Sequence, residues 1–422
     1  MAYAFLGWGY EAIGESALST VSATKAYELR DRASAPEKFF ITASYDLHVT
    51  GNLEKARHTC ESWAHAYPRD GNPHGFLAGF IYPVLGKYDR EIEEAKKLIE
   101  INPDFALGYN VLALDYEALD RLGDAENTLQ RAYERELEVP DFVVDRYQIA
   151  FLKGDQTAMK RELARGQREP EGEDLTSDLD GFGLAYFGHL REATEQTQRA
   201  VDLARRSDQR ERAALFATGI ALREAVFGNS ATARRTAKAV VELSNGREVE
   251  YGAAFALASS GDSSRAQTLA NDLEKRFPED TAVRYSYLPT LHALLALNRR
   301  DAAKAIELLQ VAAPYELGQP PSSFYGFFGM LYPIYVRGDA YLAAHRGAEA
   351  ATEFQKILNH RGIVVSDPIG ALAHLQLGRA FALSGDKTKA KAAYHDFLTL
   401  WKDADPDIPI LEQAEAEYTK LQ

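Results

Sequence analysis

The sequence is poor in cysteine, methionine and tryptophan, and it lacks an excess of basic residues. Cys60 is the single cysteine, which excludes an intrachain disulfide framework and a cysteine-based zinc site. The 62 acidic residues outnumber the 48 basic ones and give a net charge of -14. Because nucleic acids and anionic membranes are bound through clustered cations, this balance argues against both as partners of the bulk surface.

No hydrophobic segment is long and uninterrupted enough to predict a membrane helix. The longest uncharged run, Leu317 to Val336, contains three prolines and begins with polar residues. The N-terminus has no basic start, since the first lysine is Lys25, and so it does not predict a secretory signal. We expect no membrane insertion by this chain and a cytoplasmic location, or an extracytoplasmic one if a longer protein tethers it.

Catalytic motifs are missing as well. Residues 35–37 spell the APE triplet of protein kinases, but neither a Gly-rich loop nor a catalytic-loop motif accompanies them. His58 and His65 share a helix face two turns apart, which is too far for both to hold one metal ion. The sequence therefore predicts no enzyme, no catalytic residue, no metal site and no cofactor.

What the chain does contain is a repeated spacing of aromatic, small and large residues. Two clear copies of this spacing are Tyr109-x2-Leu112-Ala113-x2-Tyr116 and His374-x2-Leu377-Gly378-x2-Phe381. Glycine-containing turns recur in the middle of the units, within residues 49–56, 84–89, 152–157, 259–266 and 383–390. A glycine there suits the C-cap of one helix, and the Asp, Asn or Ser that follows suits the N-cap of the next. Each unit is therefore predicted to be a pair of amphipathic helices.

This spacing resembles the tetratricopeptide repeat, whose period is about 34 residues. A single helical hairpin cannot cover its own apolar faces, so neighbouring hairpins must stack. We therefore expect an all-α solenoid, a right-handed superhelix of about eleven hairpins that spans residues 1–422. The predicted units begin near residues 1, 37, 72, 106, 140, 174, 214, 247, 286, 331 and 371.

Longer phrases point to a narrower resemblance. The segments "KAYELRDRAS", "YPRDGNPHGF" and "RFPEDTAVRYSYLPTLHALLALN" are similar to the C-terminal repeat region of acidobacterial serine/threonine protein kinases and related regulators. The similarity covers essentially the whole chain. It implies a fragment, or a gene that kept only the repeat half, because relatives carry a kinase or winged-helix domain before the repeats.

In tetratricopeptide arrays the first helix of each hairpin lines the concave surface, so the resemblance also implies where a partner binds. The predicted concave partner-binding residues are Trp8, Tyr45, Phe76, Phe80, Asn110 and Leu114. This face is apolar and aromatic, which favours an apolar peptide or helix as ligand. The amphipathic C-terminal segment 408–422 offers an alternative, as it can fill the groove itself or cap the last hairpin.

Two irregular segments interrupt the repeats. The acidic stretch 168–181 contains proline and glycines and is predicted to be a loop or a joint between two halves. The longer unit near 313–336 concentrates aromatic residues, of which Phe324, Tyr325, Phe327 and Phe328 are candidate partner-binding residues. The alternative is that these rings only fill an uneven joint between hairpins.

Together these features predict a non-enzymatic scaffold that binds a protein or peptide, and the resemblance places it in a bacterial signalling protein. One alternative is the sensor part of a serine/threonine kinase whose catalytic domain lies outside this chain. Another is the effector region of a transcriptional regulator. The oligomeric state does not follow from the sequence.

Overall fold

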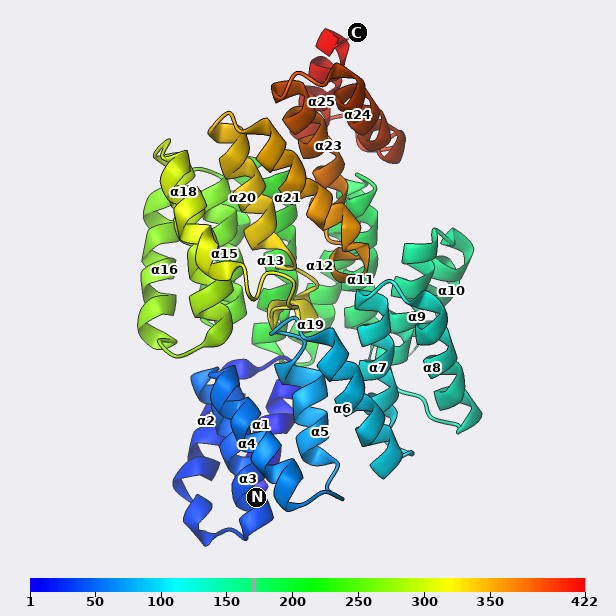
Figure 1. The fold of residues 1–422 in the computed structure, drawn as a ribbon, viewed down its shortest axis with the longest axis vertical. Helices are drawn as coiled ribbons and strands as arrows, with labels where there is room; N and C mark the ends of the chain where they lie inside the picture. The colour runs from blue at the N-terminus through cyan, green and yellow to red at the C-terminus, as the bar shows by residue number, and fades with distance from the viewer. Residues whose placement is uncertain (169–171, 422) are drawn as a thin grey trace.

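The computed structural model describes residues 1–168 and 172–421, apart from the side chain of Tyr325, and the described residues contain helices and no strand. Most helices form hairpins that follow one another along the chain (Figure 1). The pairs are α1 (Ala2–Ala12) with α2 (Ser16–Glu28), α3 (Ala35–Tyr45) with α4 (Leu53–Ala66), α5 (Asn72–Phe76) with α6 (Tyr88–Ile101), α7 (Ala106–Ala118) with α8 (Leu122–Glu134), α9 (Asp141–Lys153) with α10 (Gln156–Gly166), α11 (Glu173–Tyr186) with α12 (Leu190–Arg206), α13 (Arg210–Val226) with α14 (Ser230–Leu243), α15 (Arg247–Ser259) with α16 (Ser263–Arg276), α17 (Leu288–Asn298) with α18 (Ala302–Leu308), α20 (Tyr332–Ala343) with α21 (Gly347–Asn359), and α23 (Pro368–Leu383) with α24 (Lys387–Leu400). Each pair begins within a few residues of a predicted start. The predicted all-α fold of tetratricopeptide type is confirmed.

Shorter elements supplement these hairpins. They are the helices α19 (Ser322–Gly326), α22 (Arg361–Val364) and α25 (Pro409–Leu421), the π-helical turns η2 (Asp46–Thr50), η3 (Leu77–Ile81) and η4 (Val283–Tyr287), and the 3-10 turns η1 (Arg30–Arg32) and η5 (Leu309–Ala312). The turns η2 and η3 directly continue α3 and α5, and η4 leads directly into α17. A π-helical turn is wider than an α-helical one and shifts the register of the residues after it.

The turn chemistry read from the sequence is present in the structure. Gly154 and Gly385 end α9 and α23 with positive φ angles of 71° and 80°, which only glycine adopts without strain. The next residues, Asp155 and Asp386, each accept a hydrogen bond from a backbone N–H in the first turn of the following helix. The sequence thus encodes where one helix stops and the next begins.

The solenoid folds back on itself, which the repeat pattern did not predict. The backbone N–H of Thr281 donates to the carbonyl of Gly51 at 2.9 Å, and that of Gln319 donates to Pro83 at 2.9 Å. In Figure 1 the short helix α19 lies between the N-terminal hairpins and the central ones. The first hairpins therefore pack against residues more than 200 positions later, besides their neighbours in sequence.

The C-terminal helix α25 caps the last hairpin rather than entering a groove. The Tyr394 hydroxyl donates to Glu417 of this helix at 2.8 Å, and the Arg379 guanidinium donates to the same carboxylate. The buried Trp401 donates its indole N–H to the carbonyl of Tyr186 at 3.0 Å. Of the two roles considered for segment 408–422, the structure shows the cap (Figure 1).

The two irregular segments have different outcomes. The predicted joint over 168–181 is helical from Glu173 onward, because α11 begins there and the buried Arg212 pairs with Asp174 in its first turn at 2.6 Å. Residues 169–171 of this segment lie outside the described part of the chain. In the segment 313–336, Phe327 and Leu331 have φ angles of 52° and 60° before α20 begins at Tyr332.

Candidate partner-binding cavity

A cavity of about 1220 Å³ lies where the N-terminal hairpins face the later part of the chain. Helices α1, α3, α5, α7 and α9, together with the turn η3, supply most of its wall. The loop 66–71, the stretch 98–105 and Leu175 also contribute. The wall is completed by the segment 319–330, which includes α19, and the segment 362–366, which includes the end of α22. The cavity is therefore built from three regions that are distant in sequence.

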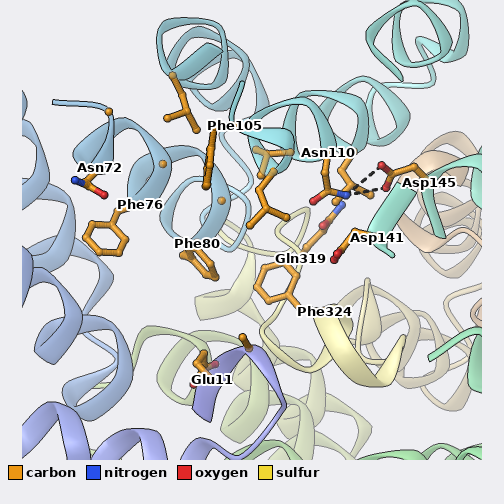
Figure 2. A pocket seen from close by; sticks show the side chains of 18 of the residues that line it. Glu11, Asn72, Phe76, Phe80, Phe105, Asn110, Asp141, Asp145, Gln319 and Phe324 are labelled. Carbon is orange, nitrogen blue, oxygen red and sulfur yellow. Dashed lines mark hydrogen bonds between the residues drawn. The ribbon is translucent and has the colours of Figure 1, made fainter. Parts of the chain in front are cut away.

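One end of the cavity is aromatic. The Trp8 ring stacks on Phe76 with centroids 4.8 Å apart, and the edge of Phe80 meets it at 4.9 Å. The Trp8 indole N–H donates to the Ser44 hydroxyl at 2.8 Å, which fixes the orientation of the ring. Phe105 lies at the same end, as Figure 2 shows. Such rigid rings offer a large apolar contact area.

The opposite end is polar and acidic. The Asn110 amide of α7 donates to both carboxylate oxygens of Asp145 in α9, at 3.0 and 3.1 Å. Asp141, one turn earlier in α9, lies beside this pair, and Gln319 faces it from the segment before α19 (Figure 2). Glu117 lies about two turns after Asn110 on α7 and lines the same cavity. The polar groups thus come mainly from the facing first helices of two successive hairpins.

Burial shifts the acids at this end toward their neutral forms. Burial raises the pKa of Glu117 well above its usual value, and the neighbouring Asp145 carboxylate raises it further. Burial likewise raises the pKa of Asp145, although the hydrogen bond from Asn110 opposes this shift. Burial also raises the pKa of Asp141, against the opposing effect of its own backbone N–H. In these residues the protein keeps carboxyl groups in surroundings that favour the uncharged state.

The structure places most of the sequence-predicted residues around one cavity. The residues of the predicted set that line it are Trp8, Phe76, Phe80, Asn110, Leu114, Phe324 and Phe327. The repeat spacing is sufficient to group the first five, because they occupy equivalent faces of first helices. Phe324 and Phe327 of the irregular segment also line the cavity, but only because the chain folds back on itself.

Two of the predicted residues whose side chains are described, Tyr45 and Phe328, do not line the cavity. Tyr45 stacks on Tyr27 of α2 with ring centroids 4.0 Å apart, at the junction where α3 passes into the π-helical turn η2. Phe328 is fully buried and packs beneath Gly252, so it faces the core instead of a partner. The Tyr325 side chain lies outside the described part of the chain.

Sequence reasoning missed the closing segment around Val365. This residue lines the cavity with a φ angle of 42°, a conformation that is strained for a β-branched side chain. Its neighbour Gly362 approaches the backbone of Glu117 so closely that a Cβ atom there would lie 1.9 Å from the carbonyl oxygen. A glycine with no place in the repeat pattern was the available signal for this close approach.

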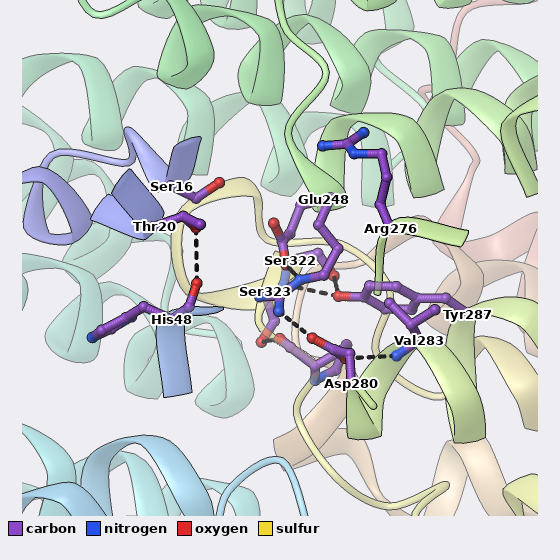
Figure 3. A network of polar contacts seen from close by, with 12 residues as sticks. Ser16, Thr20, His48, Glu248, Arg276, Asp280, Val283, Tyr287, Ser322 and Ser323 are labelled. Atoms are coloured by element: carbon purple, nitrogen blue, oxygen red, sulfur yellow. Dashed lines mark hydrogen bonds and ion pairs between the residues drawn. The ribbon is translucent and has the colours of Figure 1, made fainter. Parts of the chain in front are cut away.

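A buried ionic network lies behind the aromatic end, at the contact between the first hairpins and α15. Arg247 pairs with Asp280, which also accepts the Val283 backbone N–H at 2.9 Å (Figure 3). On the side of the first hairpins, Thr20 donates to the carbonyl of His48 at 2.8 Å. Contacts next to this network join the two sides, because the Leu53 backbone N–H donates to the Thr281 hydroxyl at 3.1 Å and the Thr281 backbone N–H donates to the Gly51 carbonyl at 2.9 Å.

Acids are buried in other parts of the fold too, and they predict how stability depends on pH. Burial raises the pKa of Asp115 to about 8, and those of Asp339 and Asp367 to about 7. A carboxyl whose pKa is raised by folding stabilises the protein fully below its unfolded pKa of about 4, and this contribution is lost as pH rises through the folded value.

The melting temperature should accordingly be a few degrees higher at pH 6 than at pH 8.5, as measured by circular dichroism. The Asp115→Asn variant should show a weaker dependence on pH, because the amide cannot ionise. A melting temperature that is flat or rises over this interval would contradict the expectation.

Within residues 1–168 and 172–421 no three His, Cys, Asp or Glu side chains are placed to hold a metal ion. None of the helices so described is both long and apolar enough to cross a membrane. The cavity with its aromatic and acidic ends is the candidate site because it brings together seven of the sequence-predicted residues.

No family model matches the chain, and no curated protein matches it either. Among solved structures, it is similar to yeast Tom70, with 13% identity over 94% of this chain and 96% of that one and a TM-score of 0.37. It is also similar to the tetratricopeptide domain of P58(IPK), with 13% identity over 92% and 98% of the two chains and a TM-score of 0.25. The third is Naa15/Naa10 bound to HypK-THB, with 12% identity over 100% of this chain and 65% of that chain and a TM-score of 0.28. At these values the similarities carry no inference about function.

Proposed function

We propose that the protein is a non-enzymatic scaffold that binds a protein partner through an apolar peptide segment held in the cavity. The observation that carries this proposal is the cavity itself, which joins apolar side chains of successive first helices into one concave surface. Its volume of about 1220 Å³ exceeds the roughly 300–1,000 Å³ typical of small-molecule pockets. A short amphipathic segment is the ligand class that such a groove accepts.

Exposed apolar side chains at this site support the proposal. Leu107 and Phe105 are 41% and 39% exposed although both line the cavity. Apolar area that is left open to water on a concave surface is a common feature of interfaces. Covering these side chains with a partner removes their contact with water and supplies binding energy.

The setting of this scaffold follows from the sequence resemblance. We propose that it is the sensor or interaction part of a bacterial signalling protein of the kind that carries a serine/threonine kinase domain, acting in the cytoplasm. The net charge of -14 and the acidic end of the cavity favour a protein partner over a nucleic acid. A kinase or winged-helix domain encoded upstream in the same gene would support this setting.

Selection of peptides tests the binding function directly. The purified chain would be used to select from a phage-displayed library of random peptides of about twelve residues, which span about 18 Å as a helix. Selected peptides should bind wild type, and Leu107→Gln should weaken them about tenfold because an apolar contact is lost. Fluorescence anisotropy of labelled peptides measures the affinity.

Leu383→Gln is the matched control. Leu383 is 40% exposed, close to the value for Leu107, and it also lies in a first helix, but away from the cavity. This variant should bind the selected peptides like wild type. Equal weakening by both variants, or no enriched peptide at all, would refute the cavity as the binding site.

A further inference from the structure

The ionisable groups that line the cavity are strongly unbalanced in charge. Among the described lining residues the carboxylates are those of Glu11, Asp70, Glu117, Asp141 and Asp145, whereas Arg69 is the one basic side chain. At the aromatic end the Arg247 guanidinium lies close enough to Glu11 to interact with its charge, although it does not line the cavity. The excess of negative groups therefore lies at the end formed by α7 and α9.

Glu117 is the most informative of these groups. It is 1% exposed, it lines the cavity, and neither of its carboxylate oxygens has a hydrogen-bond partner in the described structure. Asp145 is fully buried, and among the described residues its carboxylate is hydrogen-bonded only by the neutral amide of Asn110. Leaving buried carboxyl groups without a cation or a donor is costly, and a structure usually satisfies such groups. A ligand that carries a positive charge and hydrogen-bond donors therefore matches these carboxyl groups.

Asp141 completes the arrangement because it is partly open to the cavity. It is the first residue of α9, one turn before Asp145, and its carboxyl group lies on the cavity side in Figure 2. A cation that contacted Asp141 would have Asp145 and Glu117 directly behind it, where the surroundings exclude water. Attraction between charges is stronger there than at an exposed surface.

The geometry points to recognition of a basic side chain, a lysine or arginine carried by the apolar partner segment, at the α7–α9 end of the cavity. Asp141 makes the direct contact. A cation held there favours the ionised forms of Asp145 and Glu117, which are uncharged without it, and these two groups then add negative charge behind Asp141. The apolar residues of the same segment cover Phe76, Phe80 and their neighbours at the other end. This inference rests on the proposed function and adds the chemistry that selects the partner.

Peptides from the selection described above serve as probes. A lysine or arginine should be enriched among the peptides that depend on Leu107. Its replacement by norleucine, which keeps the alkyl chain and removes the charge, should weaken binding to wild type about 30-fold or more, because a desolvated charge pair is lost. The variant Asp141→Asn/Asp145→Asn should bind the original peptide and its norleucine form with equal and weak affinity.

A matched control and a stability measurement separate this role from a structural one. Glu412→Gln/Glu415→Gln removes two exposed carboxylates from α25 and should preserve the discrimination between the peptides. The melting temperature of Asp141→Asn/Asp145→Asn should equal or exceed that of wild type, since a neutral amide replaces a poorly compensated buried acid. The single variant Asp141→Asn, at the cavity surface, should show most of the loss.

Several results would overturn the inference. If Leu107-dependent peptides bound equally well after norleucine replaced their basic residue, the binding function would stand, but recognition of a basic side chain would be refuted. The same holds if Asp141→Asn/Asp145→Asn discriminates like wild type. Displacement of labelled peptide by octylammonium as effectively as by unlabelled peptide would assign the site to a small amine. Absence of any Leu107-dependent peptide would refute the binding function, and this inference with it.

Discussion

Replacing Asp280 by alanine should lower the free energy of unfolding by about 3–5 kcal/mol, the range for breaking a buried ion pair by removing one partner. Asp280 is 1% exposed, and Arg247, with which it pairs, is largely buried between α15 and the first hairpins. The carboxylate also accepts the Val283 backbone N–H and faces Gly51 in the turn after η2. The substitution leaves a buried guanidinium undercompensated and removes a contact that holds the back-folded hairpins in place.

Asp272→Ala provides the comparison for this variant. Asp272 belongs to the same region, on α16, but its ion pair with Arg276 is substantially exposed to water. Pairs of this kind contribute about 0–1 kcal/mol. Equilibrium denaturation in urea should separate the two variants clearly. A similar small effect for both would show that Arg247 is adequately compensated without Asp280.

The hairpins were predictable because every part of their description is local. A glycine such as Gly154 ends one helix, Asp155 begins the next, and the alternation of small and large residues sets how two helices approach. Gly378 illustrates this last point, since a Cβ atom there would lie 2.8 Å from the Tyr394 ring. Each of these requirements is met within about 34 residues of sequence, which is the span that a repeat pattern describes.

The candidate site was only partly predictable, because it depends on contacts that no repeat encodes. Helical periodicity placed Phe76 and Asn110 on the same surface. It misplaced Tyr45, which meets Tyr27 where the helix widens into a π-helical turn. The acidic end was missed because Asp145 and Glu117 are ordinary acids in the sequence, and their burial follows from the closing of the cavity by residues 319–330 and 362–366.

Gly362→Ala tests that closing contact and should destabilise the protein by roughly 3 kcal/mol, at the upper end of the usual cost of overpacking. The new methyl group would lie 1.9 Å from the Glu117 carbonyl oxygen and 2.9 Å from its carbon. Both atoms belong to the backbone of α7, so no flexible side chain can yield. Helix α22 must therefore move away from α7, although Arg361 still holds Asp120 at 2.9 Å.

Helix α22 leads into cavity-lining residues. Its movement should therefore loosen the wall of the cavity, which a stability measurement does not detect. Amide hydrogen exchange should become faster in residues 361–366 and in the end of α7, while α23 and α24 keep their protection. Gly123→Ala is the control, since its methyl group would meet no atom within 4 Å and alanine favours the helix by up to about 1 kcal/mol. If Gly362→Ala exchanged and melted like Gly123→Ala, the segment around Val365 would not close the cavity in solution, and the burial of Glu117 and Asp145 would need another explanation.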